Sequence, residues 1–396
     1  MPRRPPDGSA YDLPAPEYDA ALTRVERGTP MGELLRRYWH PVGLASDASA
    51  RPKPVRVLGE DLILFRDGGG RPGLLYPRCC HRGTTLYYGK VEAGGIRCCY
   101  HGWLFDAEGH CLDMPMEPEG GGNFRRKVRQ PWYPLRERYG LIFAYLGPPA
   151  RQPLLPRYTV LEELDDGEFV EADDQGIGTG GGPVAPCNWL QHYENVMDPL
   201  HVPVLHDGFS GTQFVAPMGI VPDVRFEPFA HGVRSYQVRQ LPEGGVLNRI
   251  TETVLPTVRV VASPRLTPGR CESIGWVLPI DSETYTVFTA ARVREAGTLG
   301  RIRSRFGGRL WSELSEREHQ DLPGDWEAQV GQGPITYHSQ EHLGSSDRGI
   351  ILLRKRLRAE AARVAAGEDP AGVAFAPADA LVESAAGNWF RDAPLP

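Results

Sequence analysis

The hydrophobic and polar positions of the chain divide it into a β-rich first part and a mixed second part. From residue 41 to about 150, alternating runs such as VRVLGEDLILFRD and YGLIFAYLG are separated by turns containing glycine and aspartate, which predicts antiparallel strands. The proline-rich stretch LGPPARQPLLPRY, at 146–158, predicts a linker. We therefore place a domain boundary there, giving a first domain at 41–150 and a second domain at 151–396.

Helical periodicity is strongest near the two ends of the chain. Thr29 and Pro30 are a candidate N-cap and first residue for a short helix over 29–39, which we expect to pack, with the rest of 1–40, on the second domain. Its apolar face would consist of Met31, Leu34, Leu35 and Trp39. A long helix is predicted over 348–366, with its Arg and Lys run as a solvated face. Its candidate N-caps are Ser345, Ser346 and Asp347, and its buried stripe would be Ile350, Leu353, Leu357 and Val364.

Between these helices, residues 222–297 alternate in hydrophobicity and predict a broad antiparallel sheet. The segment that starts at Asn188 reads as helical up to the break at Asp198 and Pro199. Strands followed by mixed helices and strands are typical of the α+β class.

Composition and charge exclude several classes of function. The 396 residues carry 44 Lys and Arg against 50 Asp and Glu, a net charge of −6, so nucleic acid and anionic membranes are disfavoured as partners. No run approaches the length of a membrane span, and the N-terminal segment has no apolar core of a signal peptide. Seven cysteines without a secretory signal predict a cytoplasmic protein in which clustered cysteines bind metal or do redox chemistry.

The first candidate site is the stretch RCCHRGTTLYYGKVEAGGIRCCYHGW at 78–103. Its first half offers Cys79-x-His81, and its second half offers either Cys98-x2-His101 or Cys99-x-His101. A disulfide framework, a structural zinc site and an iron–sulfur cluster all use this chemistry. Tight loops that present such ligands need backbone freedom, which Gly83 and Gly102 would supply.

A second candidate site follows the linker. Asp198 and His201, at positions i and i+3, share a helical face or turn, and His206 can return to the same point one turn later. A lone histidine is usually a satisfied core or surface residue. Two of them at this offset from an aspartate favour a metal site.

The first stretch strongly resembles the Rieske [2Fe–2S] motif of ring-hydroxylating oxygenases of the phthalate-dioxygenase type. The resemblance rests on Cys79-x-His81-Arg82-Gly83 and Cys98-x2-His101-Gly102-Trp103. It implies that the cluster ligands are Cys79, His81, Cys98 and His101. Cys80 and Cys99 stand where the family has Pro or an aliphatic residue. We interpret them as buried free thiols, with a disulfide or a group that tunes the cluster as the alternative.

The second stretch resembles the mononuclear iron motif of the same family, which implies His201 and His206 as two ligands of a 2-His-1-carboxylate site. The third ligand by resemblance is Asp325, with Asp321 and Glu327 as rivals. Asp198 would link the cluster of one subunit to the iron of the next. Residues expected around the iron or in the substrate pocket are Asn188, Glu194, Val202, Leu205, Phe209 and Phe214.

The resemblance implies an all-β Rieske domain and a helix-grip catalytic domain, in which a curved sheet surrounds a long helix. It also implies a homotrimer or stacked trimers, a [2Fe–2S] cluster, Fe(II) and O2, with electrons from an NAD(P)H-dependent reductase, directly or through a ferredoxin. The expected reaction is hydroxylation or demethylation of a small aromatic or heteroaromatic substrate. The alternatives are cis-dihydroxylation of an aromatic acid and, in another class, a non-catalytic Rieske electron carrier.

Overall fold

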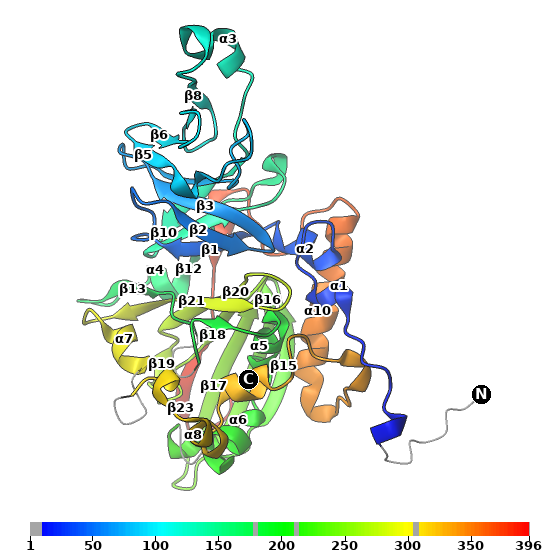
Figure 1. Ribbon diagram of the computed structural model, residues 1–396. Helices are drawn as coiled ribbons and strands as arrows, with labels where there is room; N and C mark the ends of the chain where they lie inside the picture. Colours follow the sequence, from blue (N-terminus) through cyan, green and yellow to red (C-terminus); the bar gives the residue numbers. More distant parts are fainter. Residues whose placement is uncertain (1–9, 177–180, 210–213, 304–308, 396) are drawn as a thin grey trace.

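The computed structural model describes residues 10–176, 181–209, 214–303 and 309–395. The molecule is elongated, with small sheets at one end, a large curved sheet at the other and the long helix α10 along the side of the large sheet (Figure 1). This arrangement confirms the predicted α+β class. In the described part of the chain, no helix has the length and apolar character needed to cross a membrane.

Three small antiparallel sheets build the cysteine-rich end. One has the order β2-β3-β4-β9, with bounds Lys53–Val57, Glu60–Arg66, Pro72–Leu75 and Trp132–Tyr133. A second has the order β5-β6-β7-β8, with bounds Lys90–Glu92, Gly95–Arg97, Leu104–Phe105 and Cys111–Asp113. The third has the order β1-β11-β10, with bounds Trp39–Leu44, Leu141–Tyr145 and Leu135–Arg138.

The large sheet has the main strand order β13-β21-β20-β18-β17-β16-β15. Their bounds, in that order, are Phe169–Asp173, Tyr285–Val293, Ser273–Pro279, Val258–Val261, Val246–Val254, Gly232–Gln240 and Asp223–Phe229. Three short strands lie off this path: β14 pairs with β21, β23 pairs with β17, and β19 pairs with β23. Their bounds are Val184–Ala185 for β14, Gly269–Arg270 for β19 and Gly387–Arg391 for β23. A separate parallel pair is formed by β12 and β22, at Arg157–Tyr158 and Leu381–Val382.

Most of the helices are short. The α-helices α1 to α10 span Ala20–Thr23, Pro30–Leu35, Gly122–Arg125, Thr159–Glu162, Trp189–Asn195, His201–Pro203, Thr298–Arg303, Glu316–Asp321, Asp325–Val330 and Arg348–Ala365. The segment η5, Val204–Phe209, is a π-helix. The 3₁₀ turns η1 to η4 span Ala10–Asp12, Leu86–Tyr88, Pro118–Gly121 and Pro149–Arg151, and η6 to η10 span Ala216–Gly219, Trp311–Glu313, His338–Gln340, Ser345–Asp347 and Pro377–Ala380.

The two helices predicted near the ends of the chain agree with the structure to different extents. Thr29 caps α2 as predicted, since its hydroxyl accepts from the Gly32 amide at 3.1 Å, but the helix ends at Leu35. Trp39 begins strand β1 instead of a last helical turn, because residues 39–44 pair with β11. The long helix α10 was predicted to within one residue. Its Arg354, however, is buried and ion-paired, so the prediction of a wholly solvated basic face was wrong.

One hydrophobic core runs from the small sheets into the large sheet. It includes Leu64 and Phe143 from the first part and Trp276 from β20. The turn between β2 and β3 is also bonded to the large sheet, because the amides of Leu58 and Gly59 donate to the carbonyls of Pro279 and Ile280 at 2.9 and 2.8 Å. A second core cluster surrounds Cys79 and Cys98.

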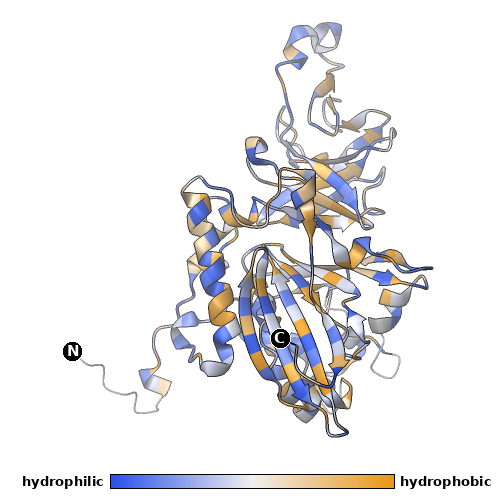
Figure 2. Ribbon diagram, turned by 180° about the vertical axis from the view of Figure 1, so that it is seen from behind, coloured by the Kyte–Doolittle hydropathy of each residue, from blue (hydrophilic) through white to orange (hydrophobic). Residues whose placement is uncertain are grey.

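The strand register decides which residues share a face of the large sheet. Residues directly opposite in an antiparallel pair point to the same face, and alternate residues along a strand point to opposite faces. Thr253 lies opposite Arg259, Arg259 opposite Gly275, and Pro279 opposite Tyr285. Arg259, Gly275 and Tyr285 therefore share one face. The alternation is visible as mixed hydrophilic and hydrophobic colouring along these strands (Figure 2).

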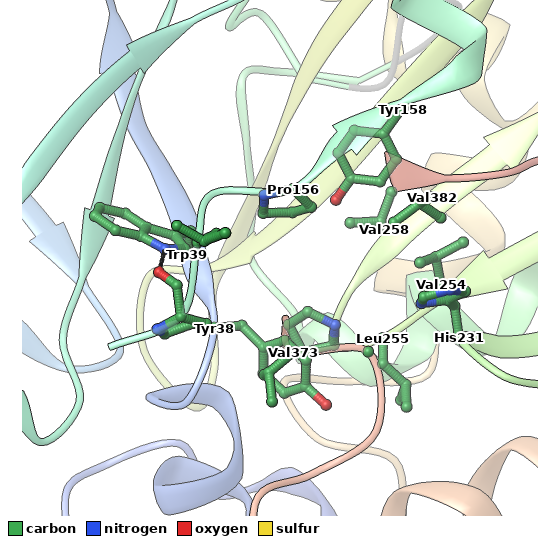
Figure 3. A pocket seen from close by; sticks show the side chains of 14 residues that line it. Tyr38, Trp39, Pro156, Tyr158, His231, Val254, Leu255, Val258, Val373 and Val382 are labelled. Carbon is green, nitrogen blue, oxygen red and sulfur yellow. Dashed lines mark hydrogen bonds between the residues drawn. The ribbon is translucent and has the colours of Figure 1, made fainter. Parts of the chain in front are cut away.

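The opposite face of the same strands borders a small pocket near the first part of the molecule. Val254 and Val258 line it together with Trp39, whose indole donates to the carbonyl of Pro153 at 2.9 Å (Figure 3). Apart from His231, its labelled lining is aliphatic or aromatic. The pocket lies on the face turned away from Arg259.

Candidate metal centres

Two tight loops with the same hydrogen-bond pattern carry the first set of predicted ligands. The amide of Gly83 donates to the carbonyl of Cys79 at 2.8 Å, and that of Gly102 to the carbonyl of Cys98 at 3.1 Å. Both glycines have positive φ, +81° and +73°, a conformation that strains residues with a side chain. The backbone of both loops therefore requires the conformational freedom that we expected glycine to supply at these two positions.

The loops bring His81 and His101 together, with ring centroids 4.5 Å apart. The ring of His81 also stacks on Trp103, at 4.4 Å and 9° between the planes. Its Nδ1 is buried and has no hydrogen-bond partner among the described residues. A buried polar atom without a partner is costly, so this nitrogen fits a metal ligand better than a structural group.

The two thiols beneath the histidines are buried, with Cys79 and Cys98 each 3% exposed. Burial raises the pKa of the Cys79 thiol to about 12, and the neighbouring Cys98 thiol adds to the shift. Thiolates would form there when a metal replaces the protons. Two buried thiols beside two histidines fit the donor set of a Rieske cluster.

Cys80 and Cys99 correct one expectation. Both are exposed, and no disulfide is formed by any cysteine in the structure. The amide of Cys80 donates to the side chain of Gln130 at 2.8 Å, while the preceding residue of each pair points into the core. The buried-thiol interpretation was therefore wrong, because the ligand cysteines take the inward positions.

The second set of predicted residues meets where three short elements converge. His201 begins α6, His206 lies in the π-helical turn η5, and Asp325 begins α9. One ligand atom of each lies within 4.8 Å of the others. π-helical turns are rare and are frequently found at functional sites. The geometry is that of a facial set of two imidazoles and one carboxylate.

At this second centre the carboxylate of Asp325 faces the imidazole rings of both histidines. The Oδ1 atom of Asp325 lies 3.4 Å from Nε2 of His201 and 3.3 Å from Nε2 of His206. Burial alone would raise the pKa of Asp325, but the two histidines hold it well below its usual range. Burial likewise opposes a charge on His201, but Asp198 and Asp325 together raise its pKa to about 10.

Asp198 lies behind His201. Its Oδ1 accepts from the amides of Leu200 and His201 at 3.0 and 3.2 Å, which fixes the carboxylate at the start of the turn. Its Oδ2 lies 3.6 Å from Nδ1 of His201, the nitrogen that faces away from Asp325. A carboxylate behind an imidazole ligand orients the ring and raises its basicity.

Asn195 was missed as a site residue. Its amide nitrogen donates to Oδ1 of Asp325 at 3.2 Å and lies 3.4 Å from Nε2 of His201. One turn earlier on α5, Nδ1 of His192 lies 3.0 Å from the side-chain oxygen of Gln329, which also accepts from the hydroxyl of Tyr285. The i, i+3 spacing of His192 and Asn195 was the available signal, since it places both on one helical face.

The rival carboxylates are engaged elsewhere. Glu327 accepts from the indole of Trp311 at 2.7 Å and contacts His319 at 2.9 Å. Asp321 has a side chain that is 66% exposed and faces Arg317. Neither lies in the three-residue cluster, so the geometry favours Asp325.

The predicted surrounding residues divide into two groups. Val202 and Phe214 pack against a small apolar cluster, and the Phe214 ring lies 4.3 Å from that of His206. Leu205 is half-buried. The other three differ from the prediction. Phe209 is 72% exposed, and Asn188 and Glu194 are buried but form their hydrogen bonds with residues outside the triad.

The corrected residues have structural roles. The Asn188 amide donates to the carbonyls of Thr23 and Ser282, and its oxygen caps α5. Glu194 receives two hydrogen bonds from Arg354, at 2.5 and 2.8 Å. Both side chains therefore fix the helix that carries Asn195 and do not face the triad.

Comparison with known proteins identifies the class. The Rieske [2Fe–2S] domain family matches residues 38–133. Over 387 residues the chain is 51% identical to the phenoxybenzoate dioxygenase subunit alpha of Ectopseudomonas oleovorans, covering 97% of this chain and 94% of that protein. The chain belongs to the Rieske non-haem iron oxygenases, as an oxygenase (alpha) subunit. It is an oxidoreductase whose family uses a [2Fe–2S] cluster, a mononuclear iron and O2, so the zinc and electron-carrier alternatives are set aside.

More distant relatives extend the range of reactions. The 5,5'-dehydrodivanillate O-demethylase oxygenase subunit of a Sphingobium strain is 35% identical, over 91% of this chain and 84% of its own. Among solved structures, the Pseudomonas putida CBB5 protein NdmA with caffeine superposes with a TM-score of 0.61 at 20% identity, covering 85% of this chain and 94% of that one. This last likeness shows the fold alone.

Proposed function

We propose that this subunit activates O2 at an iron held by His201, His206 and Asp325, with electrons from a cluster held by Cys79, His81, Cys98 and His101. The observation that carries the proposal is the convergence of the three ligand atoms within 4.8 Å, with Asp198 behind one of them. When bound, the iron supplies open positions for O2. The predicted domain boundary near residue 150 would then separate the domain that holds the cluster from the domain that holds the mononuclear iron.

Asp198 is proposed to carry the electron route. One of its oxygens accepts from the turn backbone, which fixes the carboxylate, and the other lies 3.6 Å from Nδ1 of His201. Its side chain is 29% exposed, which leaves it accessible to a histidine of a neighbouring subunit. A head-to-tail trimer would place the neighbour's cluster there, since heterologous contacts form a closed ring when their rotation closes. An NAD(P)H-dependent reductase, directly or through a ferredoxin, would supply the electrons.

The proposed substrate is an aromatic carboxylic acid of the phenoxybenzoate kind, and the proposed reaction is dioxygenation. The support is the 51% identity, over nearly the whole chain, to a protein named for that activity. This shifts our expectation from the hydroxylation or demethylation that we favoured from the sequence. O-demethylation is the second candidate, because the relative at 35% identity is named as an O-demethylase subunit.

The test is turnover of phenoxybenzoate under ¹⁸O₂ with an NADH-dependent reductase, with iron counted in the same preparation. We expect about three iron atoms per chain, two from the cluster and one from the triad. Two labelled oxygen atoms in one product indicate dioxygenation, and one indicates monooxygenation. A fully loaded preparation that consumes no O2 with any aromatic acid or aryl ether would contradict the proposal.

A further inference from the structure

Three arginines share the face of the large sheet that looks toward the triad. The register places Arg239 opposite Leu247, and Arg249 lies two residues further along the same strand. Thr253, four residues beyond Arg249, lies opposite Arg259. No salt bridge joins any of the three to a carboxylate within the described ranges. The acidic residue Glu252 points to the opposite face, where it pairs with Arg234 at 2.6 Å.

Two of these arginines donate to neutral groups, although Nη2 of Arg239 is buried without a partner. Arg249 donates to the side chain of Asn388 at 2.7 Å and to the carbonyls of Ala262 and Ser263. Arg239 donates to the carbonyl of Ile220 and the side chain of Gln237, at 2.9 and 3.2 Å. These bonds give both side chains a structural role on the interior strands β16 and β17.

Arg259 differs from both. It makes no hydrogen bond or ion pair with any residue that the structure describes, and its Nε is buried without a partner. Its guanidinium lies over Gly275 of the neighbouring strand, since a Cβ placed there would come within 2.5 Å of Nε and 3.2 Å of Cζ. The glycine thus leaves the space that the arginine occupies.

The surroundings of Arg259 place it beside the iron site. Burial is the largest cause lowering the pKa of Arg259, while the charge of Asp325 opposes that shift, and Arg259 in turn lowers the pKa of His192. Arg259 nevertheless keeps some accessible surface. The strand register puts Arg259 on the same face as Tyr285, whose hydroxyl donates to the Gln329 oxygen that also lies 3.0 Å from Nδ1 of His192. Arg259 therefore lies on the side of the sheet that faces the triad.

We propose that Arg259 binds the carboxylate of the substrate and orients the ring toward the triad. A buried guanidinium without a partner costs free energy, and a carboxylate is the planar group that its paired N–H donors match. Pairing with Asp325 instead is disfavoured, because that carboxylate already faces His201 and His206 and lies outside ion-pair distance of Arg259. The proposal rests on the proposed function in one respect, that the substrate is an aromatic acid acted on at this triad.

The test compares binding of phenoxybenzoate with that of phenoxybenzamide, which has the same shape and no charge. Binding is measured by calorimetry on the oxidised, metal-loaded protein without reductase, so that it does not depend on turnover. We expect wild type to prefer the acid. Arg259→Met should weaken acid binding by about 10- to 100-fold and leave amide binding nearly unchanged, since a hydrogen bond to a charged group contributes on this scale. Arg259→Lys keeps the charge but loses the paired donors, so it should retain only part of the preference for the acid.

Arg234→Met is the matched control, because Arg234 lies on the opposite face of the same sheet and is already paired with Glu252. It should leave the acid-to-amide ratio at its wild-type value. Equal weakening of acid and amide in Arg259→Met would overturn the proposal, as would a wild type that shows no preference for the acid. If the acid preference depends on Arg259 but no product forms, the proposed reaction fails while the carboxylate site stands.

Discussion

The first centre has its four proposed ligands on two loops within residues 79–101, whereas the second joins His206 to an aspartate 119 residues away. The two loops of the first centre repeat one backbone pattern with a glycine of positive φ. The second centre depends on the packing of α6, η5 and α9, with α5 beside them. The difference teaches that local backbone chemistry is enough for one site, while the other exists only when the whole catalytic part is folded.

Removing one ligand from each centre should separate them most strongly. Cys98→Ser is expected to lose the cluster and keep the mononuclear iron, and Asp325→Ala to do the reverse. Turnover should fall by more than about 100-fold in both, because even residues outside the ligand set cost roughly 10- to 100-fold. Iron analysis and the visible spectrum of the cluster check this. A single substitution that empties both centres would show that they are not independent.

Asp198→Ala should leave both metals largely bound and still reduce turnover by about 100-fold or more, because it removes the only described carboxylate near Nδ1 of His201. Reduction of the cluster by dithionite should be unchanged, and oxidation of the reduced cluster by the iron site should slow. Asp223→Ala, an exposed residue at the start of β15, is the control. An active Asp198→Ala enzyme would defeat the proposed electron route.

Arg354→Met tests the dependence of the second centre on packing. It leaves Glu194 and Glu341 without their shared partner in a buried setting, which should cost about 3 kcal/mol in the free energy of unfolding. Arg358→Met, on the same helix, breaks an exposed pair with Asp19 and should cost less than about 1 kcal/mol. Denaturant unfolding followed by tryptophan fluorescence measures both, and equal costs would contradict the packing argument.

Acid should act on the shared core as well as on the metal sites. Burial, together with Arg36 and against the backbone of Leu35, lowers the pKa of His40 to about 4 from 6.5. The unfolded chain therefore binds this proton first as pH falls, so stability decreases below about pH 6.5, by up to about 2 kcal/mol between pH 7 and 5. His40→Gln should flatten the pH dependence of unfolding by that amount. An unchanged slope would exclude His40 as its source.

Much of the contrast between the local first centre and the long-range second centre could be predicted from the sequence. The Cys and His spacing of residues 79–101 and the pair His201 and His206 are local patterns, and the triad places Asp325 with the histidines as expected. The errors lie where tertiary contacts decide. Glu194 faces Arg354 of a distant helix, and Arg259 lies over a glycine of the next strand, which no periodicity within one element reveals.

The apolar core that continues from β3 through β11 into β20, with the backbone bonds of Leu58 and Gly59, has a mechanical consequence. Within the described residues, this shared core leaves no hinge between the part that contains residues 79–101 and the part that contains the triad. Each protomer would then behave as a rigid spacer. In the proposed trimer, any change in the distance that electrons cross would therefore arise at the contact between protomers, through small rotations.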